Sequence, residues 1–278
     1  MTAPVNLLLI GAAGRMGQAI ARIVASGSPA GFRIAAALDR PESPRIGQDV
    51  AAAAGRPLGI PVTADWKAAL AAGADVAVDF SAAAASADAA PRMADAGLPW
   101  VVGATGLSPE QKAAVAAVAH RIPVVIAPNM SLGINLLYAL IEQAAQALRA
   151  KGYDCEIIER HHRRKKDAPS GTALFLGEAA AAGFGWALPD VAVDGRSGLT
   201  GERPEREIGF HAVRGGDFAG DHSVLFAADG ECLELSHRAT SRDTFAYGAL
   251  RAAAWLPGRP PALYGMRDVL GLHPGGDP

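Results

Sequence analysis

The stretch that decides the fold runs from residue 5 to residue 17 and reads VNLLLIGAAGRMG. Val5–Ile10 is a mainly apolar run of strand length, and three glycines in a GxxGxxG arrangement follow it directly. Arg15–Ser26 then carries its apolar side chains at helical spacing, and Gly27 can end that helix. The stretch predicts a buried strand, a tight turn and a helix, the unit from which parallel α/β sheets are built.

The first half of the chain repeats this alternation. Further strands are predicted at Ile34–Leu38, Ala74–Phe80, Trp100–Val102 and Val124–Ala127. An Ala-rich helix separates two of these strands, and Ser108 with Gln111 forms a capping box that starts another helix. We therefore expect a Rossmann-like domain with a parallel sheet.

The pattern changes after Pro128. The elements that we expect there are a helix at Ile134–Ala150, a strand at Cys155–Arg160, a helix from Thr172, a long loop at Asp190–Pro204, strands at Phe210–Arg214, His222–Ala228 and Cys232–His237, and a helix at Thr244–Leu256. Strands without helices between them favour a mixed or antiparallel sheet. The chain thus reads as α/β, with a dinucleotide-binding domain at 1–130 and 241–278 and an α+β domain at 131–240.

Composition narrows the functional classes. The chain has 278 residues, 50% of them hydrophobic, and a formal net charge of -2. This argues against a disordered chain and against bulk nucleic-acid binding. Cys155 and Cys232 form no CxxC pair and no metal-ligand spacing, so we expect two reduced, buried thiols and no metal. The apolar run at Val5–Ile10 is too short for a signal peptide or a membrane span, which predicts a cytoplasmic protein without a membrane partner.

The glycine turn is a candidate cofactor site. Glycines allow backbone to approach a pyrophosphate, and the helix N-terminus offers N–H groups and a favourable dipole. The residues that we expect to line this turn are Gly11, Ala12, Ala13, Gly14, Arg15 and Met16. Asp39 ends the second strand, where a carboxylate can accept ribose hydroxyls, whereas the neighbouring Arg40 suits a 2′-phosphate. The pair predicts NADH, NADPH or both.

Two later loops also follow strand ends, where ligands bind in open α/β sheets. They contain Gly103, Ala104 and Thr105, and then Ala127, Pro128, Asn129 and Met130. Asn129 could bind the nicotinamide carboxamide. Taken singly, each loop could equally be an ordinary turn.

The most informative stretch is ERHHRRKKDAPSGT, residues 159–172. A solvated basic face is the usual explanation for such a run, and a nucleic-acid patch is weakened by the lack of interleaved aromatic residues. A pocket for an anionic substrate accounts for more of it. Histidine and lysine can both transfer protons, and Gly171 with Thr172 at a helix N-terminus could hold a carboxylate. The surrounding cations should also make Lys165 a readier proton donor.

The run HHRRKKDAPSGTA at residues 161–173 resembles the signature of the dihydrodipicolinate reductase family. Further segments similar to that family occur in the same order: Gly11–Gly17, Asp79–Phe80, Gly103–Gly106, Ala127–Asn129, Ser236–Ala246 and Met266–Leu270. The resemblance covers nearly the whole chain. It departs from the family at Ala104 and Met130, where threonine and often phenylalanine are expected.

The resemblance implies NAD(P)H-dependent reduction of the cyclic dicarboxylate 4-hydroxy-tetrahydrodipicolinate to tetrahydrodipicolinate, in lysine and diaminopimelate biosynthesis. His161 would be the general acid/base and Lys165 the proton donor. His162 would help to bind the substrate, while Gly171 and Thr172 would hold one carboxylate. The family is usually a homotetramer assembled through the sheet of the second domain.

Two rival interpretations remain. Another two-domain nicotinamide oxidoreductase could act on a sugar or an amino-acid aldehyde, although it would not need the residues of 161–172. A non-catalytic NAD(P)-sensing protein could use the basic loop to bind nucleic acid, but the near-neutral charge and the lack of a DNA-binding motif oppose this.

Overall fold

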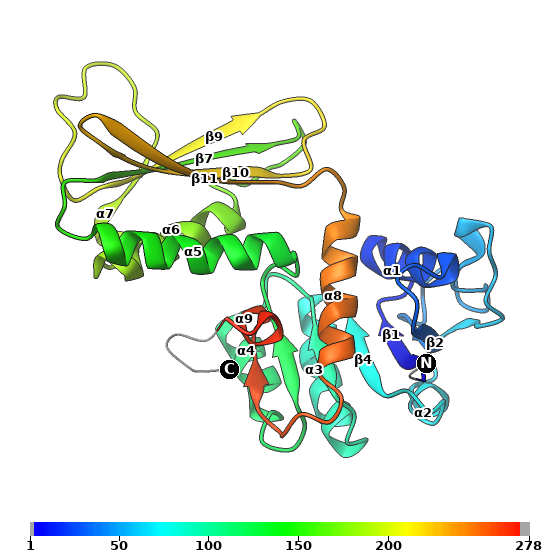
Figure 1. Ribbon diagram of the computed structural model, residues 1–278. Coiled ribbons are helices and arrows are strands. Elements are labelled where there is room, and N and C mark those ends of the chain that lie inside the picture. The colour runs from blue at the N-terminus through cyan, green and yellow to red at the C-terminus, as the bar shows by residue number, and fades with distance from the viewer. Residues whose placement is uncertain (1–2, 273–278) are drawn as a thin grey trace. The chain divides into compact units, whose positions relative to one another are not determined.

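The computed structural model describes residues 3–272 (Figure 1). The chain divides into two compact units. The first contains the residues up to Leu132 and those from Asp243 onward, and the second is Gly133–Arg242. The first unit is therefore discontinuous in sequence, and its last helix follows the whole of the second.

The first unit is built on a seven-stranded parallel sheet in the order β12-β6-β5-β4-β1-β2-β3. Its strands are β1 (Val5–Ile10), β2 (Phe32–Leu38), β3 (Val62–Thr63), β4 (Val76–Asp79), β5 (Trp100–Val102), β6 (Val124–Ile126) and β12 (Leu263–Tyr264). Leu7 and Leu9 face one hydrophobic cluster, whereas Leu8 and Ile10 face another. The sheet is covered on both faces, which explains why the buried part of the first strand, residues 7–10, is apolar.

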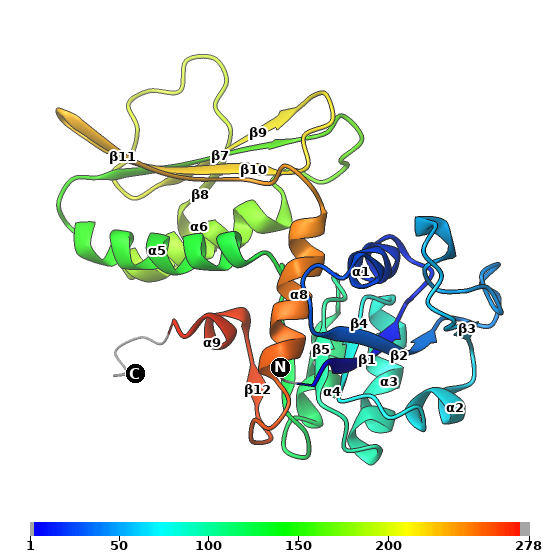
Figure 2. The same cartoon turned by 45° about the vertical axis from the view of Figure 1, so that its right-hand side comes forward.

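Helices cover both faces of this sheet (Figures 1 and 2). They are α1 (Arg15–Ser26), α2 (Trp66–Leu70), α3 (Ala83–Asp95), α4 (Pro109–Ala117), α8 (Asp243–Trp255) and α9 (Met266–Leu270), with a 3₁₀ turn at Ala52–Ala54. Helices α1 and α8 pack together on one face, and α3 and α4 on the other. The capping box predicted at Ser108 and Gln111 is present.

The glycine turn between β1 and α1 requires glycine at two positions. Gly11 has φ +75°, and a Cβ there would lie 2.8 Å from the backbone of Phe80 and Ser81. A Cβ on Gly17 would lie 2.3 Å from the carbonyl oxygen of Gly11. Helix α1 can therefore start close against the strand only because these side chains are missing.

The second unit contains a five-stranded sheet in the order β11-β10-β7-β9-β8. Its strands are β7 (Asp154–His161), β8 (Ala192–Asp194), β9 (Ile208–Arg214), β10 (Asp221–Ala228) and β11 (Glu231–Arg238). Strand β9 runs parallel to β7 and β8, whereas β10 runs antiparallel to β7 and β11. The sheet is mixed, and the predicted α/β fold with a second, mixed sheet is confirmed.

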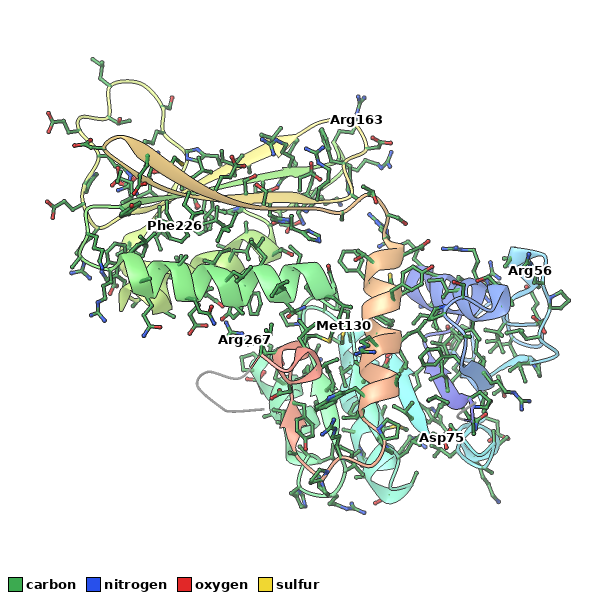
Figure 3. All side chains as sticks on the ribbon, in the orientation of Figure 1. Arg56, Asp75, Met130, Arg163, Phe226 and Arg267 are labelled. Atoms are coloured by element: carbon green, nitrogen blue, oxygen red, sulfur yellow. The ribbon has the colours of Figure 1, made fainter. Side chains whose placement is uncertain are left out.

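Helices α5 (Leu132–Leu148) and α6 (Gly171–Phe184) lie on one face of this sheet (Figure 1). Burial along β7 alternates strictly, as expected when only one face of a strand meets the core. Phe226 lies between the sheet and the helices (Figure 3) and makes an edge contact with Phe184. The second unit thus has its own hydrophobic core.

The structure corrects two expectations. The segment Asp190–Pro204 is not wholly a loop, because α7 (Leu188–Val191) and β8 overlap its start. Strand β8 is too short to give a periodic signal, and its pairing with β9 creates it. Cys155 is buried, and burial raises the pKa of its thiol to about 12, but Cys232 is exposed on β11 rather than buried. Within residues 3–272, none of the helices is both long and apolar enough to span a membrane.

Candidate active site

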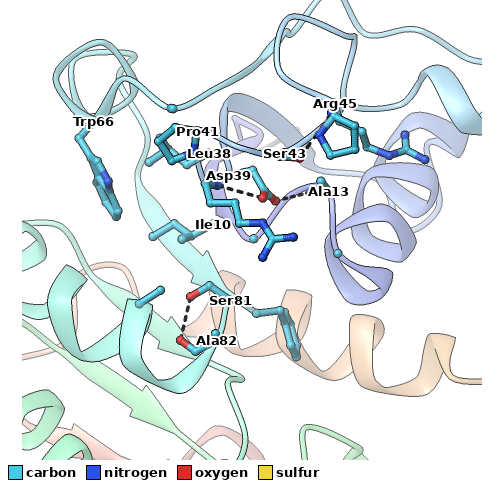
Figure 4. Close-up of a pocket in the computed structure, with 17 residues that line it drawn as sticks. Ile10, Ala13, Leu38, Asp39, Pro41, Ser43, Arg45, Trp66, Ser81 and Ala82 are labelled. Atoms are coloured by element: carbon cyan, nitrogen blue, oxygen red, sulfur yellow. Dashed lines mark hydrogen bonds between the residues drawn. The ribbon is translucent and has the colours of Figure 1, made fainter.

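A cavity of about 600 Å³ opens at the carboxyl ends of β1, β2 and β4 in the first unit (Figure 4). Predicted cofactor residues that line it are Gly11, Ala13, Gly14, Asp39 and Arg40. Its volume lies in the range of small-molecule sites, and its position at the strand ends is where α/β sheets bind ligands. The residues predicted from the turns after β1 and β2 are therefore neighbours in the fold and line the same cavity.

Asp39 is tied to the glycine turn. Its Oδ2 accepts a hydrogen bond from the Ala13 amide at 2.7 Å, and its Oδ1 accepts one from the Arg40 amide at 2.9 Å (Figure 4). The carboxylate is thus fixed beside the turn while it still lines the cavity. A fixed acceptor beside a phosphate-sized turn fits the ribose end of a nicotinamide dinucleotide.

Other lining residues were not predicted. They are chiefly Ser43, Arg45, Trp66, Phe80 and Ser81. Arg45 is a second arginine among the lining residues, and Trp66 contributes a flat apolar surface. Ser81 follows strand β4 and could have been found by the strand-end rule, but Arg45 and Trp66 stand where no periodic signal existed.

The remaining residues of the glycine turn lie around the cavity rather than on its wall. Ala12 is fully buried, Met16 packs against the core, and Arg15 is exposed. These positions shape the turn through their backbone.

The loop after β5 adjoins the cavity through one aromatic ring. The amide of Gly103 donates to the carbonyl of Asp79 at 2.8 Å, and a Cβ on Gly103 would meet the ring of Phe80. Ala104 is buried and Thr105 exposed. The loop therefore lies next to Phe80, which itself lines the cavity.

The loop after β6 is placed differently. Asn129 accepts a hydrogen bond at Oδ1 from the Ser131 amide at 2.9 Å, while Ala127 is buried and Pro128 exposed. Met130 is 2% exposed and belongs to the core, so its side chain is not available to a ligand in this structure (Figure 3). Of the described residues, those of this loop and of the loop after β5 do not form the wall of the 600 Å³ cavity.

In the second unit, the end of β7 carries a buried charged cluster centred on Glu159. This side chain is 1% exposed. Its Oε2 accepts from His161 Nδ1 at 2.5 Å and from Arg214 Nη1 at 2.7 Å. Its Oε1 accepts from Arg214 Nη2 at 2.7 Å and from the Ser170 amide at 3.0 Å. Burial alone would raise the pKa of Glu159, but the hydrogen bonds from His161 and Arg214 outweigh it and lower the pKa to about 2.

Lys165 and His162 lie on the loop that follows. The Lys165 ammonium pairs with Asp167 at 2.8 Å, so it is not surrounded by cations alone. His162 Nδ1 accepts from the Arg164 amide at 3.2 Å. Desolvation, together with the charges of Arg242 and Arg164, lowers the pKa of His162, which favours its neutral form. Arg163 extends away from the sheet into solvent (Figure 3).

The first turn of α6 begins beside the same cluster. Ser170 is the N-cap, and its hydroxyl accepts from the Ala173 amide at 3.1 Å and lies 3.2 Å from His222 Nε2. Gly171 is exposed and Thr172 partly so, in the positions expected for a carboxylate site. Burial and the neighbouring His161 lower the pKa of His222 to about 3, so His222 is neutral at physiological pH.

The contacts through Glu159 thus connect His161 to the start of α6. Glu159, Arg214 and His222 were not predicted as site residues. Glu159 stands two positions before His161 on the same face of a strand, a spacing that could have identified it. Arg214 and His222 come from β9 and β10, and only the pairing of those strands with β7 brings them near.

Comparison with protein families settles the relationship. Residues 5–130 match the family described as dihydrodipicolinate reductase, N-terminus, and residues 133–270 match dihydrodipicolinate reductase, C-terminus. The chain belongs to the dihydrodipicolinate reductase family. Members of this family are oxidoreductases of lysine biosynthesis that use NADH or NADPH, so the family, activity and cofactor class predicted from the sequence are confirmed.

Individual members of the dihydrodipicolinate reductase family agree. The 4-hydroxy-tetrahydrodipicolinate reductase of Thiobacillus denitrificans is 54% identical over 96% of this chain and 99% of its own. That of Anaeromyxobacter dehalogenans strain 2CP-1 is 50% identical over 97% and 99%. Among solved structures, a dipicolinate-bound dihydrodipicolinate reductase from Paenisporosarcina sp. TG-14 matches with a TM-score of 0.74, 22% identity and coverage of 95% and 99%. A myo-inositol dehydrogenase described as putative, from Sinorhizobium meliloti 1021, matches with a TM-score of 0.57, 15% identity and coverage of 90% and 88%, and shares only the fold.

Proposed function

We propose that the chain carries out its family's reaction with the groups assembled at the end of β7. His161 acts as the general acid/base that assists loss of the 4-hydroxyl as water. Lys165 donates the proton that completes reduction of the ring. His162 and the first turn of α6, at Gly171 and Thr172, hold the dicarboxylate. The observation that supports this proposal is the hydrogen bonding of Glu159 to both His161 and the N-cap of α6, because these contacts join the proposed acid/base group to a helix N-terminus suited to an anion.

In this proposal the cavity of the first unit holds the cofactor. The Gly11–Met16 turn receives the pyrophosphate, Asp39 the ribose, and Arg40 a 2′-phosphate when present. The loops at Gly103–Thr105 and Ala127–Met130 receive the nicotinamide end. Bound NADH or NADPH supplies the hydride. The chain's own residues hold the substrate, neutralise its carboxylates and supply protons.

A coupled assay tests the reaction. Dihydrodipicolinate synthase generates the unstable substrate from pyruvate and aspartate semialdehyde, and oxidation of NADH and NADPH is followed in parallel. We expect rapid oxidation that depends on the synthase. A folded protein that binds cofactor but oxidises neither would overturn the substrate assignment.

Lys165→Ala tests the proton donor. Loss of a general acid costs about 10²–10⁴ in rate. We therefore expect kcat to fall by that factor while the Kd for cofactor is unchanged. Lys166→Ala is the matched control, because Lys166 is the neighbouring, exposed lysine. Equal kcat in the two variants would exclude Lys165 as the donor.

Arg40→Ala tests cofactor choice. Because a guanidinium binds a phosphate dianion and Asp39 serves the ribose hydroxyls, we expect the KM for NADPH to rise about tenfold or more and that for NADH to change little. Parallel titrations with the two cofactors measure this. An equal rise for both would place Arg40 outside the 2′-phosphate site.

We further propose a cytoplasmic homotetramer assembled through the sheet of the second unit. Helices cover one face of that sheet (Figure 1). The other face carries Ile158 and Leu225, both partly exposed, and the exposed Val213, beside the ion-paired Glu156. A sheet face without helices that presents some apolar side chains suits association with identical copies. Light scattering should give four chains for the parent and fewer for Leu225→Arg. A monomeric parent would refute this assembly.

A further inference from the structure

The buried carboxylate of Glu159 has a role that the reaction residues leave unassigned. A charged side chain that is 1% exposed costs several kcal/mol in desolvation unless it is paired and hydrogen-bonded. Here Arg214 pairs with both carboxylate oxygens, each at 2.7 Å, and further donors complete the set. Glu159 is therefore an ionised acceptor, as its pKa of about 2 also indicates.

An ionised carboxylate can only accept hydrogen bonds. The contact of 2.5 Å between Glu159 Oε2 and His161 Nδ1 therefore requires the proton to reside on Nδ1. In the neutral imidazole the lone pair then belongs to Nε2. That nitrogen faces Gly220, where an added Cβ would crowd it at 3.1 Å, so the glycine leaves Nε2 uncovered by a side chain at this position.

Arg214 extends this arrangement to the loop of the proton donor. Besides its two bonds to Glu159, its Nη2 donates to the carbonyl of Asp167 at 2.7 Å. Asp167 in turn holds the Lys165 ammonium. His222 faces the His161 ring edge-on at a centroid distance of 5.2 Å and is the other titratable group against it. One ion pair thus contacts the acid/base histidine, the lysine loop and the start of α6.

We propose that Glu159, held by Arg214, is a positioning residue that fixes His161 in its Nδ1–H tautomer and presents Nε2 for proton transfer. This inference rests on the acid/base role proposed for His161. It requires neither Glu159 nor Arg214 to touch substrate. Carboxylates that orient a histidine in this way commonly stabilise the imidazolium as well.

The tautomer can be read directly. Nitrogen NMR on the full-length protein labelled with ¹⁵N-histidine distinguishes a protonated Nδ1 from a protonated Nε2, and loss of signals in His161→Asn assigns them. We expect Nδ1–H for the neutral form of His161 in the parent protein. A neutral His161 that carries its proton on Nε2 would overturn the inference without any further variant.

Glu159→Gln then separates positioning from simple structure. A glutamine side chain has one accepting oxygen, whereas the carboxylate has two, so we expect a loss of the Nδ1–H population of His161. The kcat should then fall by about 10²-fold, with KM and cofactor Kd nearly unchanged. Glu156→Gln is the matched control. Glu156 stands on the same strand in a second cluster with arginines and a histidine, His211, at 2.7 Å. It should change neither the His161 tautomer nor kcat.

The outcomes distinguish the two proposals. An altered tautomer together with a lower kcat supports both. An altered tautomer with unchanged kcat supports positioning by Glu159 and refutes the acid/base role of His161. An unaltered tautomer refutes positioning. If Glu159→Gln does not fold, Arg214→Lys retains the charge but loses the two-pronged contact, and it should lower kcat with partial loss of the Nδ1–H signal; an unchanged signal and rate there would also refute the inference.

Discussion

Asp79 is a buried carboxylate at the end of β4, fully excluded from solvent. Its Oδ1 accepts from the Ser81 amide at 2.8 Å, whereas among residues 3–272 no hydrogen-bond partner reaches its Oδ2. Burial raises the pKa of Asp79, and hydrogen bonds from Ser81 and Ser86 oppose this only in part. An acid whose pKa is higher in the folded state binds its proton more tightly there, so stability falls as pH rises from 3.8 toward the raised value.

Asp79→Asn removes this dependence. We expect the unfolding free energy of the variant, relative to the parent, to improve as the pH rises from 3.8 toward the raised pKa of Asp79. Denaturant unfolding at several pH values measures the difference. A constant difference across that range would mean that Asp79 is ionised in the folded protein at all of them.

At the residue scale, sequence reasoning found the groups with chemical character and missed their supports. His161, Lys165 and Asp39 stand in stretches whose spacing and composition already suggested a site. Arg214 and His222 do not, because their nearness to Glu159 is created by strand pairing across 55 or more residues of chain. A single sequence carries no local signal for such a contact.

At the element scale, the turn before α1 depends on Gly17. A Cβ there would lie 2.3 Å from the Gly11 carbonyl and 2.7 Å from Ala12 Cα, and backbone atoms cannot move aside as a flexible side chain can. We expect Gly17→Ala to destabilise the protein by about 2 kcal/mol or more and to weaken cofactor binding.

Thermal unfolding and cofactor titration test this. Gly265→Ala is the control, because an added Cβ there meets only Asp268 at 3.8 Å. If the two variants were equally stable, the close approach of α1 to β1 would not be needed.

Helix α4 offers a test of capping alone. The Ser108 hydroxyl accepts a hydrogen bond from the backbone amide of Gln111 at 3.2 Å, and the Gln111 side-chain oxygen accepts one from the backbone amide of Ser108 at 2.8 Å. Ser108→Ala should lower the unfolding free energy by about 1 kcal/mol and leave kcat unchanged. Chemical denaturation beside the coupled assay checks both, and a loss of activity without a loss of stability would contradict this role.

Elements were predictable where one signal dominated. Strand β1 and helix α1 have the predicted bounds, because an apolar run and a helical period are each bordered by glycine. The short elements β3, β8 and β12 were not predicted. They have two or three residues each and exist because an established neighbour strand offers its edge.

At the scale of the whole molecule, acid should affect the two units differently. Glu156 and Glu159 both belong to the second unit, and the pKa of each is about 2. Burial alone would raise these pKa values, but hydrogen bonds from arginine and histidine outweigh burial and lower them. The stability that these two carboxylates give to the folded state is fully present above pH 4.5 and is lost as the pH falls toward about 2. Asp79 in the first unit acts in the opposite direction.

We therefore expect the second unit to open first on acidification. Hydrogen exchange followed by mass spectrometry at decreasing pH resolves the two units by their peptides. Glu156→Gln should reduce the acid sensitivity of residues 133–242. Earlier opening of the first unit would show that other carboxylates dominate.

The discontinuity of the first unit has a consequence for synthesis. Leu250 of α8 and Leu256, which follows this helix, are fully buried in the same cluster as Leu7 and Leu9 of β1. On the ribosome, β1 emerges first but must wait for α8, while residues 133–242 can complete their own core in between. A nascent chain arrested at Arg242 should be protease-resistant in its second unit and cleaved in its first. Only full-length translation products can therefore acquire a finished nucleotide site, and prematurely terminated ones would be left open to quality-control proteases.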